Sequence, residues 1–265
     1  MTIFKRLFDF YIQSSIHVGL AVFSLVYSTA FENDLCKHIT YPSCVLFGTI
    51  LGYNFLKYFD VYRKGKFKSL KYYGIILVCL FSLYGFYFFF RIIIDAIKVQ
   101  LILGGILVLV YPLLRKHGIL KMFFVSFVVA YLTAFVYIIK SPMYHGIAIL
   151  DFAKRFVLIS ALMIPFEIYD SQDDDKTMNT LPQKFGVETA KKFGYFILLL
   201  FVVMDVVNFN FNGNIKFQYL FIDILIVFVI AISIYFSSIK RNQYYTSFWV
   251  ESIPILWWVL LFMVQ

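Results

Sequence analysis

Five acidic side chains follow the apolar run that ends at Phe166: Glu167, Asp170, Asp173, Asp174 and Asp175. Helical positions i, i+3 and i+7 share one face, so Glu167, Asp170 and Asp174 line up while Asp173 points elsewhere. Three aligned carboxylates offer the oxygen ligands that suit Mg²⁺, which usually bridges to substrate phosphates. The alternative is a solvated helix end followed by an acidic turn, and the spacing alone leaves both interpretations open.

The composition assigns this acidic cluster to a membrane protein. The chain is 62% hydrophobic, 21% aromatic and only 15% charged, with a mean hydropathy of +0.82. Soluble domains carry more charge and less apolar surface. Because carboxylates are costly at the edge of a bilayer, those kept there indicate a functional site. The net charge of +9 is spread over short loops and does not indicate a nucleic-acid partner.

Apolar runs long enough to cross a bilayer recur along the whole chain, and we count about nine of them. They lie at residues 12–31, 41–60, 72–90, 99–114, 119–139, 147–169, 193–209, 217–238 and 247–264. We therefore predict an all-α polytopic membrane protein, with residues 1–265 as a single domain and no linker that would suggest a second.

The basic residues predict the orientation in the membrane. Most of the 24 Lys and Arg residues, Lys121 among them, fall on one side if the N-terminus is cytoplasmic. Lys154 and Arg155 count with the opposite side. We predict a multi-pass protein of the cell inner membrane with a cytoplasmic N-terminus, an outer C-terminus and a cytoplasmic acidic cluster.

Four further polar residues stand one to three turns inside the ends of predicted spans: His17, Asp205, Asp223 and Glu251. Such residues can line a transport or proton pathway. We expect instead that each has a local partner near the membrane interface.

A turn and the start of a new helix follow the acidic cluster, marked by Pro182 and Gly186. The string Glu167-x-x-Asp170-x-x-x-Asp174, followed by Thr180-Leu181-Pro182 and Gly186, resembles the second Asp-rich motif of the UbiA superfamily of intramembrane prenyltransferases. In that superfamily the acidic string ends the sixth helix, as it does here.

Two other stretches bear on this resemblance. Tyr111-Pro112-Leu113-Leu114-Arg115-Lys116 is similar to a Tyr-Pro string with basic residues that members carry between the fourth and fifth spans. The first Asp-rich motif, expected near the end of the second span, is retained only at Asn54. Aromatic residues stand where its acids are expected, at Phe55, Tyr58 and Tyr62.

The resemblance implies a helical bundle around a central cavity, with prenyl transfer from a prenyl diphosphate to a hydrophobic, often aromatic, acceptor in the lipid bilayer. It implies Mg²⁺ on Glu167, Asp170 and Asp174, with Asp170, Asp174 and Asn54 in the catalytic set. The residues then expected to bind the diphosphate are Lys57, Arg63, Tyr111, Arg115 and Lys116. Arg offers a bidentate fork to phosphate oxygens and Lys a point charge.

Two other functions are compatible with the sequence. A non-catalytic member that binds an isoprenoid lipid is favoured by the lost first motif. A small transporter is less well supported, because no inverted repeat or broken mid-membrane helix is visible in the sequence.

Overall fold

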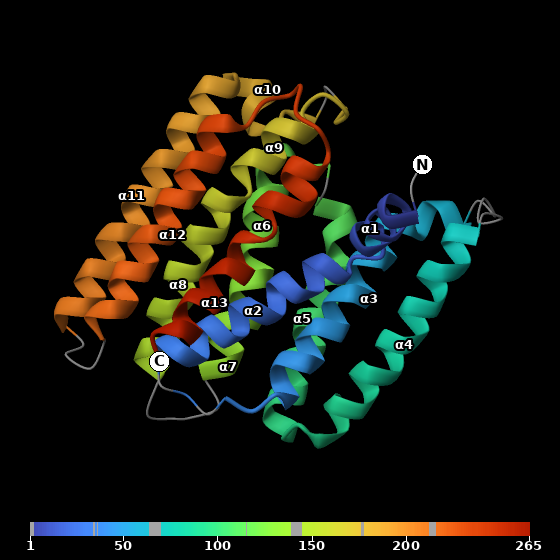
Figure 1. Cartoon of the computed structure of the whole chain (residues 1–265), viewed down its shortest axis with the longest axis horizontal. Helices are drawn as coiled ribbons and strands as arrows, with labels where there is room; N and C mark the ends of the chain where they lie inside the picture. The colour runs from blue at the N-terminus through green and yellow to red at the C-terminus, as the bar shows by residue number, and fades with distance from the viewer. Residues whose placement is uncertain are drawn as a thin grey trace.

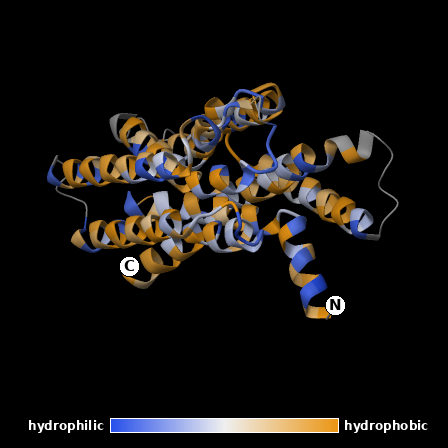
Figure 2. Ribbon diagram, turned by 90° about the horizontal axis from the view of Figure 1, so that it is seen from above, coloured by the Kyte–Doolittle hydropathy of each residue, from blue (hydrophilic) through white to orange (hydrophobic). Residues whose placement is uncertain are grey.

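The computed structural model describes residues 3–33, 35, 37–63, 70–114, 116–138, 145–175, 178–211 and 216–265. These residues form helices joined by short connections, and the predicted all-α class is confirmed. The N-terminus lies at one end of the bundle and the C-terminus at the other (Figure 1). Hydrophobic residues cover most of the length of the helices (Figure 2), as expected of segments whose outer faces meet lipid.

The longer helices follow the predicted apolar runs, while two shorter helices, Ile3–Gln13 and Leu181–Phe185, form outside them. The first half comprises α1 (Ile3–Gln13), α2 (Ile16–Glu32), α3 (Thr40–Arg63), α4 (Leu70–Ile92) and α5 (Asp95–Leu114). The next run is continuous, with α6 (Gly118–Ala130), a π-helical stretch (Tyr131–Phe135) and α7 (Val136–Ile138). The remainder comprises α8 (His145–Leu162), α9 (Ile164–Asp170), α10 (Leu181–Phe185), α11 (Val187–Phe211), α12 (Phe217–Phe236), a π-helical stretch (Tyr245–Val250) and α13 (Ile253–Met263).

Six helical segments of the described chain are long and apolar enough to cross a membrane, and α1 with α2 makes a seventh if this pair, bent by 55°, counts as one span. The predicted spans at residues 41–60 and 147–169 are helical but do not meet the same criterion. Helix α8 carries three charged side chains, which lower its hydropathy. The count of nine spans therefore stays a prediction, as does the orientation in the membrane.

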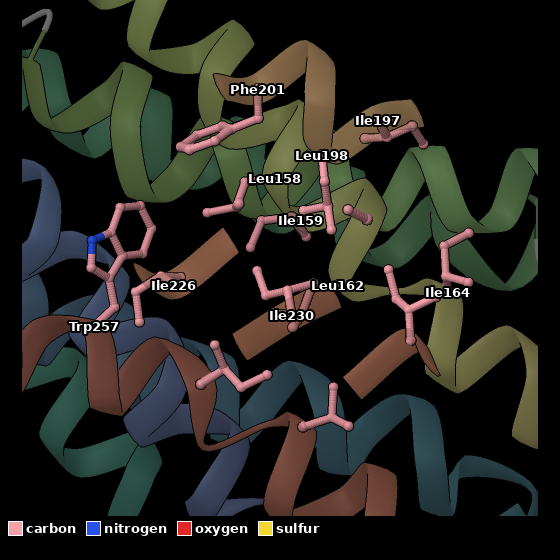
Figure 3. Packing of buried hydrophobic residues seen from close by; sticks show 14 of the residues in the cluster. Leu158, Ile159, Leu162, Ile164, Ile197, Leu198, Phe201, Ile226, Ile230 and Trp257 are labelled. Atoms are coloured by element: carbon pink, nitrogen blue, oxygen red, sulfur yellow. The ribbon is translucent and has the colours of Figure 1, made fainter. Parts of the chain in front are cut away.

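The main core lies where α8, α9, α11, α12 and α13 meet. Leu158, Phe201, Ile226, Ile230 and Trp257 are among its buried members, and their side chains gather between four helices, α8, α11, α12 and α13 (Figure 3). Within a bilayer this packing gains dispersion energy rather than hydrophobic energy, since lipid tails are as apolar as leucine. The outer faces of α4 and α5 remain largely exposed, as lipid-facing surfaces should.

A network of charged side chains is buried toward the end of the bundle where α2 ends and α12 begins (Figure 1). Lys154 pairs with Asp205, and Arg155 donates to Thr29 Oγ1 at 3.0 Å and lies 3.6 Å from Glu32. The sequence analysis counted Lys154 and Arg155 as charges of the outer side. The structure instead buries both inside the bundle. They are only 6% and 3% exposed because carboxylates of neighbouring helices compensate their charge.

The aromatic and carboxylate groups of α12 and α13 extend this network. Trp257 Nε1 donates to Asp223 Oδ1 at 2.8 Å, and the Arg155 guanidinium lies 4.3 Å from the Trp257 ring centroid. On α8, Asp151 accepts a 2.7 Å hydrogen bond from the Asn33 amide. The expected local partners of Asp205 and Asp223 are thus present, and His17 likewise bonds the Tyr11 hydroxyl at 2.7 Å.

Candidate functional site

Lys121 lies at the centre of the acidic cluster. Its ammonium pairs with Asp174 and lies 3.5 Å from Glu167 Oε1, and the charge of Asp170 acts on both Lys121 and Glu167. Helix α6 supplies the lysine, while α9 and the turn after it supply the carboxylates. Two of the three residues predicted as metal ligands, Glu167 and Asp174, are therefore brought together at a lysine that sequence reasoning had assigned to a cytoplasmic loop. Asp170, at the end of α9, is exposed and acts on them through its charge. We call Lys121, Glu167, Asp170 and Asp174 the acidic corner.

The acidic corner is mostly buried and carries more negative than positive charge. Glu167 and Lys121 are 2% and 6% exposed, and the Asp174 side chain is 11% exposed. Glu167 Oε2 is buried without a hydrogen-bond partner among the described residues. Glu167 and Asp174 contact one ammonium here, and the exposed Asp170 adds a third negative charge nearby. A buried ion pair with excess negative charge is costly unless a further cation or donor compensates it.

The Thr-Leu-Pro segment holds the turn that carries Asp174. Gln183 Nε2 donates to the backbone carbonyls of Ser171, Asp174 and Asp175 at 3.2–3.4 Å, and its Oε1 accepts from the Thr180 N–H at 3.1 Å. Thr180 stands at the N-cap of α10, and Pro182 occupies the first turn, where its missing N–H costs nothing. The segment therefore fixes the acidic turn against the start of α10.

Helix α6 reaches the acidic turn because its first residue is a glycine. At Gly118, where φ is +21°, an added Cβ would lie 2.2 Å from the Met178 carbonyl oxygen and 2.4 Å from that of Asn179. No side chain fits at that separation. The glycine thus permits the backbone contact that places Lys121, one turn later, beside Asp174.

We expect Gly118→Ala to lower the free energy of unfolding by about 2 kcal/mol or more, because both the overlap and the positive φ penalise a Cβ. Gly105→Ala on α5 is the matched control, since an added Cβ there meets nothing within 4 Å. Alanine in that helix interior should be neutral or stabilising by about 0.5–1 kcal/mol. Thermal unfolding in detergent measures both, and equal melting temperatures would contradict the proposed contact.

The residual first motif lies against the break between α1 and α2. Asn54 Nδ2 donates to the Ser14 carbonyl at 2.8 Å, and its Oδ1 accepts from Ser15 Oγ at 3.0 Å. Tyr58 OH donates to the Gln13 carbonyl at 2.8 Å. Ser15 has a left-handed φ of 61°, so its backbone interrupts the helix. Through these contacts Asn54 stabilises the break between α1 and α2. Its predicted catalytic role stays a prediction.

The predicted diphosphate-binding residues are dispersed around the same end of the bundle. Lys57 is exposed on α3, where its charge and that of Glu251 act on each other. Lys116 is exposed just after α5, and the Tyr111 ring stacks on Phe124 with centroids 6.4 Å apart. Arg115 and the side chain of Arg63 lie outside the described residues.

Sequence reasoning missed Lys121 because it stands at the start of an apolar run, where the positive-inside rule explains any lysine. The run Gly118-Ile119-Leu120-Lys121-Met122 offered one signal, since a lysine one turn inside a span must either reach the interface or find a buried partner.

The donor atoms of the acidic corner are of the type that binds magnesium. Carboxylate oxygens are the ligands Mg²⁺ prefers, and the unpartnered Glu167 Oε2 is a buried acceptor of this type. Among the described residues no three acidic, His or Cys side chains are arranged to hold a metal ion. At the acidic corner, the contacts of Glu167 and Asp174 are with the Lys121 ammonium.

Comparison with known proteins identifies the fold. No family model and no curated protein matches the sequence. Among solved structures, an apo UbiA homologue from Aeropyrum pernix K1 aligns over 92% of this chain and 97% of its own, with a TM-score of 0.69 and 13% identity. A UbiA homologue from Archaeoglobus fulgidus, solved with GPP and Mg²⁺, aligns over 96% and 99%, with a TM-score of 0.65 and 16% identity.

A third solved structure, described as concerning the biosynthesis of digeranylgeranylglyceryl phosphate synthase in membranes, aligns over 98% of this chain and 96% of its own, with a TM-score of 0.59 and 12% identity. This protein therefore has the fold of UbiA homologues over nearly its whole length, as the motifs in its sequence predicted. Since the identities are low, the likeness extends to the fold and not to a particular reaction.

Proposed function

We propose that this protein transfers a prenyl group from a prenyl diphosphate to a hydrophobic acceptor within the membrane. The observation that carries the proposal is the acidic corner, where Glu167, Asp170 and Asp174 gather at one end of a bundle with the UbiA fold. One structural neighbour is bound to GPP and Mg²⁺ and another to DMAPP and Mg²⁺, which supports a diphosphate substrate here.

Magnesium bound by Glu167, Asp170 and Asp174 would supply positive charge for the departing diphosphate. The exposed Lys57 and Lys116 would supply positive charge to the diphosphate oxygens. In the reaction the bond between the allylic carbon and the diphosphate oxygen breaks, and its electron pair leaves with the diphosphate. The acceptor supplies the pair for the new bond and loses a proton.

Aromatic rings continue from the acidic corner into the bundle and would surround the prenyl chain. Phe123, half a turn beyond Lys121, contacts Phe156 and Phe193 with centroids 6.0 and 6.4 Å apart. Phe127 lies edge-on to Phe152 at 5.3 Å. Ring faces stabilise a neighbouring cation and exclude water from it, which suits an allylic carbocation.

A non-catalytic protein that binds a prenyl diphosphate is the second candidate. The observation in its favour is the first motif, whose Asn54 and Tyr58 hold the α1–α2 break rather than offering acids to a second metal. Such a protein would bind the substrate and release no diphosphate.

Incubation of the purified protein with radiolabelled prenyl diphosphates of several lengths, with and without Mg²⁺, separates these functions. We expect Mg²⁺-dependent release of diphosphate, with transfer to a suitable acceptor. Binding without release would favour the non-catalytic protein, and the absence of both would refute the proposed function.

A further inference from the structure

Lys121 has no place in the ligand set that the motif predicts, yet its ammonium contacts two members of that set, Glu167 and Asp174. Its ammonium has three donors. The described contacts direct two of them to Asp174 and Glu167. A metal ion bound by the same carboxylates would lie close to this ammonium, and the two positive charges would repel each other. Lysine and metal therefore compete for the acidic corner.

We propose that Lys121 is a displaceable counter-ion of this site: Glu167 and Asp174 hold it when the site is empty, and it turns to the diphosphate when a divalent cation binds. The inference rests on the proposed function. It assigns Lys121 a binding role that neither its position in the sequence nor the motif provides.

The surroundings of Lys121 allow such an exchange. A lysine has four rotatable side-chain bonds, so its ammonium can move while its backbone stays fixed in α6. Glu167 Oε2 already lacks a partner, so a cation gains a buried acceptor without breaking any described hydrogen bond. The excess of carboxylates over ammonium also means that the corner can accept positive charge before the lysine leaves. Metal and diphosphate should consequently bind with positive coupling, because each stabilises the arrangement that the other needs.

The proposal predicts effects of opposite sign for one substitution. In Lys121→Met, we expect Mn²⁺ affinity to rise by about tenfold, because the competing charge is gone. At saturating Mn²⁺ we expect the same variant to bind pyrophosphate about tenfold more weakly, because a phosphate contact is gone. Electron paramagnetic resonance of free Mn²⁺ and calorimetry with pyrophosphate measure the two constants. A lysine with only a structural role would not produce this pair of changes.

Two variants serve as controls. Lys121→Arg retains the charge and should keep both affinities closer to those of the natural protein. Lys192→Met removes the same charge from an exposed position at the start of α11. Its Mn²⁺ affinity should stay within about twofold of the natural value, because solvent and salt screen a distant surface charge. A rise in Lys192→Met equal to that in Lys121→Met would overturn the proposal.

Labelling of lysines in the natural protein tests the exchange without any substitution, which matters if Lys121→Met folds poorly. A small acylating reagent, read out by mass spectrometry, should modify Lys121 slowly in the metal-free protein. Mn²⁺ alone should increase its modification, and pyrophosphate added with Mn²⁺ should suppress it again. If Mn²⁺ and pyrophosphate bind but leave Lys121 labelling unchanged, the exchange is wrong and the proposed function stands. If the natural protein binds neither, the proposed function fails with it.

Discussion

Replacement of Lys154 by methionine is expected to lower the free energy of unfolding by about 3–5 kcal/mol, the cost of leaving a buried charge without its partner. Lys154 pairs with Asp205 inside the bundle, and the charges of Glu32, Asp151 and Asp223 also act on it. Methionine fills a similar volume, so the packing changes little. The loss of stability therefore comes from the carboxylates, which stay buried but no longer have their main counter-ion.

A double substitution separates charge from packing in this prediction. Lys154→Met combined with Asp205→Leu removes both members of the pair, and we expect it to recover at least half of the lost stability. Lys192→Met, which removes an exposed lysine, should change stability by less than about 0.5 kcal/mol. Equilibrium unfolding in mixed micelles gives all three values. A single substitution no more harmful than the double one would contradict a paired role for Lys154.

The longer helices of this protein could be predicted from its sequence because they follow apolar runs, whereas α1 and α10 lie outside the predicted runs. The expected span at residues 41–60 is α3, Thr40–Arg63, and the expected span at 217–238 is α12, Phe217–Phe236. The interruptions were harder to predict. The π-helical stretches and the break at Ser15 depend on contacts between helices, such as the hydrogen bonds of Asn54, which no local pattern encodes.

The acidic corner was predicted in part. The helical spacing of Glu167, Asp170 and Asp174 predicted one shared helix face, but α9 ends at Asp170, and Asp174 contacts Lys121 from the turn after the helix. Their role as metal ligands stays a prediction. Lys121 lies 46 positions before Glu167 in the sequence, and its partners depend on the packing of α6 against the turn at Met178 and Asn179. Buried pairs such as Lys154 with Asp205 have the same origin. Each charge alone looks like an interface residue, and only the tertiary structure joins them.

Asp174→Asn should reduce diphosphate release by about 100-fold if the proposed function is correct. The carboxylate of Asp174 makes the direct contact with Lys121 and belongs to the proposed metal ligands. An amide of the same shape keeps the volume but loses the charge that orients the lysine and binds the cation. Displacement of catalytic groups by about 1 Å costs about 100-fold in rate, and the loss of a ligand adds to this.

Asp173→Asn is the matched control for that substitution, because it makes the same chemical change one residue away. Asp173 is exposed, whereas the Asp174 side chain is 11% exposed and paired. We expect Asp173→Asn to retain activity within about threefold, since an exposed charge is screened by solvent. The rate of diphosphate release, measured with a radiolabelled prenyl diphosphate at saturating Mg²⁺, shows which of the two carboxylates the reaction needs. Equal losses would mean that the negative charge of the turn as a whole matters and that Asp174 has no specific role. A loss confined to Asp174→Asn would support a diphosphate site at the acidic corner, because among the described residues of the turn Asp174 contacts Lys121 and Asp173 does not.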